Sequence, residues 1–142
     1  FIDIAGEPWS GSAFILRLIA ASLIVPVFEE YIMRGYIFRV AFQWNEIRKQ
    51  KKWRSALHEA LDNRSIDDVP PGAWSVAAIV ISTVAFTAGH LMIEWPAAVV
   101  YSILMSVLWI IRKDLLSCMV AHGVTNFLLA LYVYYTGHWG FW

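Results

Sequence analysis

Four apolar segments separated by polar stretches run along the chain, and they cover residues 13–44, 73–92, 96–111 and 115–135. A helix needs about 20 residues to cross the ~30 Å hydrocarbon core of a bilayer. Backbone groups in lipid must also be hydrogen-bonded within their own segment, which favours helices over isolated strands. The second and fourth segments have this length, and the shorter third one has Trp95 and Trp109 near its ends, where interfacial aromatic residues belong. The pattern predicts an all-α, multi-pass transmembrane helical bundle with about four membrane helices.

The polar stretch at residues 45–72 predicts a different environment. Apolar residues recur within it at helical spacing, at Trp53, Ala56, Leu57, Ala60 and Leu61. This spacing is typical of an amphipathic helix, which could lie on the membrane surface. The stretch is also basic, and its cations are Arg48, Lys49, Lys51, Lys52, Arg54 and Arg64. A solvated basic loop is the favoured interpretation of these charges, and a specific lipid or nucleic-acid site is the alternative.

The positions of Lys and Arg orient the predicted bundle. Two spans lie between the 45–72 loop and the pair Arg112 and Lys113, so both basic stretches are on the same side of the membrane. The positive-inside rule places that side in the cytoplasm. We therefore expect a multi-pass integral membrane protein whose basic loops face the cytoplasm.

Composition supports a membrane protein and excludes several other classes. Hydrophobic residues make up 59% of the 142 residues and charged residues 15%, against roughly 45–50% and 25% in soluble domains. A disordered chain and a disulfide-stapled mini-protein are excluded. Eleven basic residues balance eleven acidic ones, so no overall field favours nucleic acid. The length predicts one membrane-embedded domain over residues 1–142, and the abrupt start predicts a fragment that lacks upstream helices.

A small set of polar residues lies inside the apolar segments. An ionisable side chain at the bilayer centre costs roughly 2.5–3.5 kcal/mol on insertion scales. Such residues must therefore face one another or a wet intramembrane cavity, which makes them candidates for a functional site. They are Glu29, Glu30, Arg34, His90, His122 and Asn126.

The first apolar segment carries the most informative of these residues. Pro26 has no N–H to donate to the Ser22 carbonyl, so we expect a kink one turn before the acids. Glu30 and Arg34 are spaced i,i+4 with the acid first, the favourable order for an ion pair. Glu29 points about 100° away around the helix and is left available as a general base. The alternative is a Glu–Arg network that only holds helices together.

Two further motifs lie on the second and fourth spans. Phe86 and His90 share one helix face, and so do His122 and Asn126, which present an imidazole and an amide to the same point. The second pair could donate to a developing oxyanion, although an interhelical hydrogen bond is an equal alternative. By depth, the three motifs converge in one layer only if the first helix continues to Trp44, and we expect that long helix.

Together, these motifs resemble the CPBP family, the Abi or type II CAAX prenyl endopeptidase group. Its signature of EExxxR, FxxxH and HxxxN on successive membrane helices corresponds to the three motifs already named, and the resemblance covers about residues 22–136. Family members usually have additional upstream spans. The C-terminal stretch from Tyr132 to Trp142 is similar to the CAAX protease-related proteins of bacterial exosortase systems, which implies a bacterial cytoplasmic (inner) membrane. The 28-residue gap between Trp44 and Ala73 is long for the family.

The resemblance implies a role for each site residue. Glu29 would activate a water as general base, and His90 would help to hold and polarise that water. His122 and Asn126 would stabilise the oxyanion, while Glu30 would orient the site through Arg34, with Phe86 in support. No cofactor is required on this interpretation. Zinc is the alternative, and its ligands would be Glu29, His90 and His122.

The expected function is therefore an intramembrane endopeptidase. It would hydrolyse a peptide bond near the C-terminus of a membrane-associated or prenylated protein, and its partners would be that substrate and the lipid bilayer. The alternative is a non-enzymatic membrane scaffold or a bacteriocin-immunity-type protein that uses the same polar cluster for helix packing. A proton-coupled carrier is disfavoured, because its acids would be distributed along a path.

Overall fold

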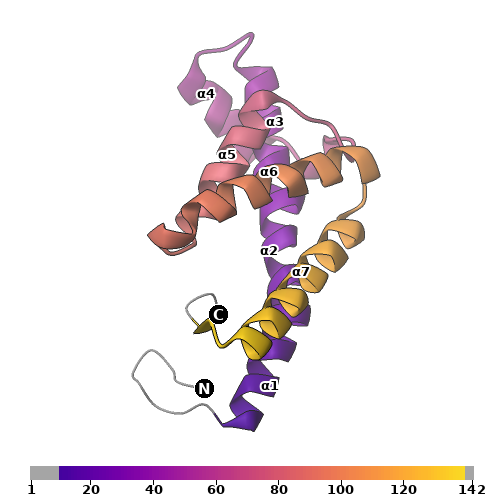
Figure 1. The fold of residues 1–142 in the computed structure, drawn as a ribbon. Coiled ribbons are helices and arrows are strands. Elements are labelled where there is room, and N and C mark those ends of the chain that lie inside the picture. Colours follow the sequence, from indigo (N-terminus) through magenta and orange to yellow (C-terminus); the bar gives the residue numbers. More distant parts are fainter. Residues whose placement is uncertain (1–9, 140–142) are drawn as a thin grey trace. The chain divides into compact units, whose positions relative to one another are not determined.

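The computed structural model of the chain describes residues 10–139, and within that range every regular element is a helix. The all-α prediction is confirmed. The chain forms two compact units: one holds the residues up to Glu29 and those from Met119 onward, and the other holds Glu30–Cys118. Figure 1 labels the main helices along the chain. The α-helices are α1 (Gly11–Ile19), α2 (Val25–Glu30), α3 (Phe38–Ile47), α4 (Trp53–His58), α5 (Val76–Ala88), α6 (Trp95–Arg112) and α7 (Leu115–Thr136).

The first helix is one continuous stretch of 37 residues, Gly11–Ile47. Two π-helical segments interrupt its α-helical parts, and they are η1 (Ala20–Ile24) and η2 (Tyr31–Ile37). At 1.5 Å per residue the stretch is about 55 Å long, well beyond the ~30 Å hydrocarbon core. The long first helix expected from the sequence is therefore present, and it is longer than the hydrocarbon core is thick.

The π-helical segment η1 lies directly before Pro26. The backbone N–H of Val25 donates to the Ala20 carbonyl, five residues back. The next carbonyl in this register belongs to Ala21, and its donor would be residue 26, which as a proline has no N–H. The expected disturbance at Pro26 thus takes the form of a widened turn with an open carbonyl, a form in which π-segments occur within α-helices.

The second and third spans differ from their predictions. Helices long and apolar enough to cross a membrane are Gly11–Ile47, Met92–Arg112 and Leu115–Thr136. The second predicted span, 73–92, was wrong in length, because α5 has only 13 residues and ends at the C-cap Gly89. The third span gains residues instead: the 3₁₀ turn η5 (Met92–Glu94) precedes α6, whose first turn contains Pro96. Gly89 ends α5 earlier than predicted, because glycine is favoured just after the last residue of a helix. Pro96 is in the first turn of α6, where proline is favoured.

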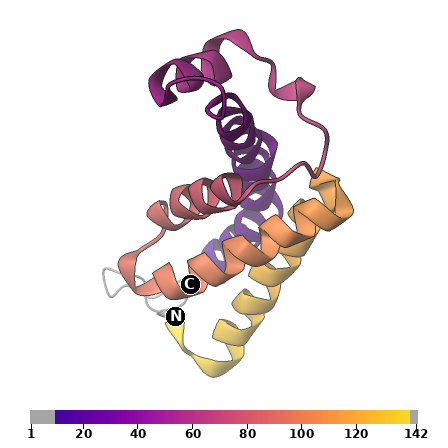
Figure 2. The same ribbon diagram turned by 90° about the horizontal axis from the view of Figure 1, so that it is seen from above.

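The larger unit is built around α5, which packs against both α3 and α6. Figure 2 shows α5 and α6 side by side after the short connection between them. Small residues fill this packing, and several of them are almost completely buried: Ala78, Ser82, Ala98, Ser102 and Ser106. Small side chains let membrane helices approach closely, and hydroxyl groups can hydrogen-bond across the contact.

Asp114 caps α7 after the turn from α6. Its Oδ1 accepts a hydrogen bond from the Ser117 backbone N–H at 2.7 Å, and its Oδ2 accepts one from Ser117 Oγ at 2.8 Å. The bond from the Ser117 backbone is the main cause that holds the pKa of this carboxyl below its usual range, and the Ser117 hydroxyl and Arg112 add to it. An ionised Asp114 thus satisfies one of the N–H groups that the first turn of a helix leaves open.

Replacing Asp114→Ala should lower the melting temperature of the purified protein in detergent by a few degrees at pH 7. Since the folded-state pKa is lowered, the stabilisation is fully present above the ordinary carboxyl pKa of about 4. It is lost as the pH falls through the lowered folded-state value. The difference in melting temperature between wild type and variant should therefore shrink below about pH 4. Asp68→Ala is the matched control, and an equal pH-dependent loss in both variants would contradict the capping role.

Candidate functional site

The predicted site residues fall into two groups, one in each compact unit. Glu29, His122 and Asn126 belong to the smaller unit, and the remaining residues belong to the larger one. The latter are Glu30, Arg34, Phe86 and His90. Each group has its own internal geometry.

Arg34 is the centre of the larger unit's group. Its side chain and that of Glu30 have no exposed surface, and Arg34 Nη1 donates to Glu30 Oε1 at 3.3 Å. Nη2 donates to the main-chain carbonyl of Ser102 at 2.8 Å and to Ser102 Oγ at 3.1 Å. The i,i+4 pair expected from the sequence is therefore present, and it is joined to α6.

Sequence reasoning missed the contribution of α6 to this network. The Ser102 carbonyl also accepts a hydrogen bond from Ser106 Oγ at 2.8 Å. Ser102 and Ser106 are spaced i,i+4 within an apolar helix, and both are fully buried. That spacing was the available signal. The decisive acceptor, however, is a backbone oxygen, and no side-chain pattern identifies it.

Phe86 connects the arginine to His90. The Arg34 Cζ lies 5.5 Å from the centroid of the Phe86 ring, within range of a cation–π contact. The Phe86 ring also packs against two other aromatic rings: its centroid is 4.5 Å from that of His90 and 5.9 Å from that of Tyr101. Phe86 is therefore the aromatic spacer of the group, which gives the FxxxH spacing a physical reason.

His90 lies just beyond the end of α5, and its imidazole bonds back to the helix. The Nδ1 atom is 2.8 Å from the carbonyl oxygen of Phe86. A carbonyl can only accept, so this hydrogen bond requires the proton to be on Nδ1. In the neutral imidazole, Nε2 is then the atom with a free lone pair, available to accept a proton or a hydrogen bond.

Glu29 and His122 come together within the smaller unit. Glu29 Oε2 lies 3.7 Å from His122 Nε2, a distance within ion-pair range and beyond a direct hydrogen bond. The His122 side chain is 5% exposed and the Glu29 side chain 35% exposed. The carboxylate is thus partly exposed while the imidazole beside it is buried. Of the two adjacent acids, Glu30 is held by an arginine and Glu29 is the accessible one.

Asn126 donates a hydrogen bond to the Ala21 carbonyl, which has no backbone donor because residue 26 is a proline. Its Nδ2 donates to the Ala21 oxygen at 2.8 Å. His122 and Asn126 therefore contact positions eight residues apart on the first helix, about 12 Å along its axis. The sequence predicted that both side chains point to one place, and the structure instead directs them to two levels of the helix.

Gly123 allows this close approach of α7 to the first helix. A Cβ atom at position 123 would lie 2.4 Å from the Ser22 main-chain oxygen. No real Cβ contact is that short, and a backbone atom cannot move aside as the end of a side chain can. The glycine between His122 and Asn126 is therefore required for the contacts that both neighbours make.

The zinc alternative would use Glu29, His90 and His122 as ligands. Among the residues that the structure describes, no group of three or more His, Cys, Asp or Glu is placed to hold a metal ion. Glu29 and His122 supply two ligands, whereas catalytic zinc sites use three protein ligands and a water. His90, the third ligand of the zinc alternative, belongs to the other compact unit, and the zinc alternative stays a prediction.

A family model decides the relationship of this chain to known proteins. The family described as Type II CAAX prenyl endopeptidase Rce1-like matches residues 11–128, well over half of the chain. The chain belongs to this family. All seven predicted site residues lie in the matched range, and members of the Rce1-like family are proteases. With its long apolar helices, this Rce1-like chain is an integral membrane protein. No curated protein and no solved structure matches it.

The likeness to the exosortase-associated subgroup was drawn from the C-terminal stretch. Gly140, Phe141 and Trp142 of that stretch lie outside the described residues. The family match ends at residue 128, before the stretch begins. The subgroup therefore stays a prediction.

Replacing Arg34→Ala should destabilise the protein by about 3–5 kcal/mol, because the buried Glu30 carboxylate loses its compensating charge. Ser102→Ala is the matched variant: it removes one hydroxyl acceptor and keeps the main-chain carbonyl, so its cost should be only about 1 kcal/mol. Chemical unfolding in detergent measures both. Equal losses for the two variants would contradict the central position of the guanidinium.

Proposed function

We propose that this chain is an intramembrane endopeptidase that uses Glu29 to activate a water. Membership of the Rce1-like family supports a protease, and the accessible Glu29 carboxylate beside the buried His122 imidazole is the observation that carries the proposal. The substrate is a membrane or prenylated protein of the CAAX type, cut near its C-terminus. Both compact units form one protease domain in the bacterial cytoplasmic membrane.

Glu29 and Glu30 have different proposed roles because their side chains have different partners. Glu30 already accepts a hydrogen bond from Arg34 and has no exposed surface, so it orients the site rather than taking up a proton. Glu29 is partly exposed and within ion-pair range of an imidazole. It takes a proton from the water as the oxygen attacks the scissile carbonyl, and that proton then passes to the leaving amine.

The two histidines have different roles in this proposal. His90 Nε2 accepts a hydrogen bond from the attacking water, a role that its Nδ1 proton on the Phe86 carbonyl favours. His122 donates to the oxygen that becomes negative in the tetrahedral intermediate. Asn126 donates to the Ala21 carbonyl and supports the oxyanion site by holding α7 against the first helix, so that His122 is the direct donor.

A scaffold that uses the same residues for helix packing is the second candidate function. The observation that favours it is the Asn126–Ala21 hydrogen bond, which is a structural contact between two helices. In a scaffold, Glu29 would have no chemical role, and its removal would leave the protein's behaviour unchanged. An activity measurement separates the two candidates.

Replacing Glu29→Gln should lower kcat for a fluorogenic farnesylated CAAX peptide by at least about 10²-fold, the lower range for loss of a general base. The amide keeps the size of the side chain and cannot take up the proton. Because Glu29 is partly exposed, the melting temperature should change little. The assay uses purified protein in lipid nanodiscs, and Asp62→Asn is the control for loss of a surface carboxylate. Undiminished turnover by Glu29→Gln would overturn the proposed mechanism.

Chelation tests the zinc alternative directly. On the proposed mechanism, a membrane-permeant chelator such as 1,10-phenanthroline leaves turnover unchanged, and added Zn²⁺ does not stimulate it. A complete loss of turnover that Zn²⁺ alone restores would instead assign a metal to the site, with Glu29 among its ligands. The non-chelating isomer 1,7-phenanthroline controls for direct effects of the compound on the bilayer.

A further inference from the structure

The amphipathic segment at residues 53–63 lies across α3 instead of along it. The segment consists of α4 and the π-helical η3 (Glu59–Asn63). At its start, Trp44 Nε1 donates to the Trp53 carbonyl at 3.4 Å, and just past its end Gln43 Nε2 donates to the Ser65 carbonyl at 2.5 Å. Eleven helical residues span about 16 Å. Consecutive residues of α3 could not hold both ends if the two helices ran side by side.

The apolar positions of this segment are divided between two environments. Ala56 and Ala60 are buried, with relative exposures of 0% and 1%, and the segment packs against α3. The three bulky residues are exposed instead: Trp53 by 59%, Leu57 by 38% and Leu61 by 48%. The sequence predicted a single apolar face. The structure buries only its two alanines and leaves a stripe of large side chains uncovered by the described chain.

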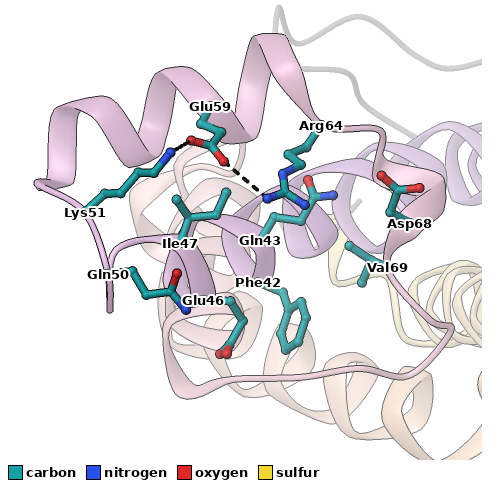
Figure 3. A pocket seen from close by; sticks show the side chains of 10 residues that line it. All are labelled: Phe42, Gln43, Glu46, Ile47, Gln50, Lys51, Glu59, Arg64, Asp68 and Val69. Atoms are coloured by element: carbon teal, nitrogen blue, oxygen red, sulfur yellow. Dashed lines mark hydrogen bonds and ion pairs between the residues drawn. The ribbon is translucent and has the colours of Figure 1, made fainter.

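The opposite flank of the segment is charged. Lys51 and Arg64 both bind the Glu59 carboxylate at one edge of a pocket of about 450 Å³ (Figure 3). Hydrogen bonds from these two cations lower the pKa of Glu59, that from Lys51 most. Phe42, Glu46 and Ile47 of α3 line the same pocket, so this flank of the segment faces the pocket. Leu57 and Leu61 are each two residues from Glu59, about 200° around the helix.

The stripe is therefore turned away from the pocket and its ion pairs, on an exposed side of the segment. Cations flank it at its start, since residues 48–54 contain five of the chain's eleven Lys and Arg and no acid. Lys52 and Arg54 stand on either side of Trp53 and are exposed, and the Arg54 Cζ lies 5.6 Å from the centroid of the Trp53 ring. A tryptophan with flanking cations is the composition that binds an anionic membrane surface.

We propose that residues 53–63 form an interfacial helix that binds the anionic lipid of the same bilayer. Trp53, Leu57 and Leu61 enter the boundary between headgroups and acyl chains, while Lys52 and Arg54 contact the phosphates. This binding is independent of the proposed peptidase chemistry. It fixes the height at which the first helix leaves the membrane, because both ends of the segment are held by adjacent residues of α3.

Fluorescence quenching in reconstituted vesicles tests the proposal. A single cysteine carries an environment-sensitive fluorophore at Leu57→Cys, in a Cys118→Ser background, and Ser55→Cys is the matched control. Ser55 is exposed and lies two residues from both Trp53 and Leu57, on another flank of the same helix. Vesicles contain phosphatidylcholine alone or with phosphatidylglycerol, and quenchers are either attached to the lipid or dissolved in water.

In the anionic vesicles, the lipid-attached quencher should reduce the Leu57 label's emission about twofold more than that of the Ser55 label. The difference should fall in phosphatidylcholine vesicles and in a Lys52→Gln/Arg54→Gln variant. Equal access of the aqueous quencher to both labels would overturn the proposal. A Leu57 label shielded from both quenchers would also overturn it, because the stripe would then be covered by protein, such as a second copy of the chain. Lipid contact without any dependence on anionic lipid would refute the role of the cations.

Discussion

A buried guanidinium sets the strongest constraint on the larger unit. Arg34 has no exposed surface, and leaving it without acceptors in an apolar bundle would cost several kcal/mol. Its acceptors come from its own helix through Glu30 and from α6 through Ser102. The position of α6 against the first helix is thus determined by a polar requirement, in a region where apolar packing alone would allow helices to slide. The same requirement keeps Glu30 engaged and leaves the neighbouring Glu29 as the accessible acid.

Local spacing predicted much of this arrangement. Residues four positions apart on one helix lie on the same face, and that simple geometry predicted the Glu30–Arg34 pair. The same spacing predicted the contact of Phe86 with His90, whose rings are 4.5 Å apart although His90 lies beyond the end of α5. The long first helix was also predictable, because its apolar residues continue to Trp44 without a strong breaker. Pro26 disturbs the helix without ending it, since a widened turn absorbs the missing hydrogen bond.

The remaining features depend on partners that a one-dimensional pattern does not specify. The acceptor for Arg34 on α6 is a main-chain carbonyl, and every residue has one. Asn126 finds the Ala21 carbonyl only because a proline five residues further along the partner helix lacks a donor. In the amphipathic segment, alanine and leucine count equally as apolar, yet only the alanines are small enough to be buried against α3. The apolar pattern of the second span continues to Met92, whereas the backbone of α5 ends at the glycine cap three residues earlier.

The open carbonyl at Ala21 also has a consequence for hydration of the first helix. A vacant acceptor in a membrane helix attracts water unless a side chain occupies it. Asn126 occupies this one, and Gly123 lets the two helices close over the neighbouring Ser22 oxygen. Eight residues further along, Glu29 is about one-third exposed. The first helix therefore has its open carbonyl covered at one level and a partly exposed carboxylate at another, so that the main-chain acceptor at Ala21 is already satisfied by protein.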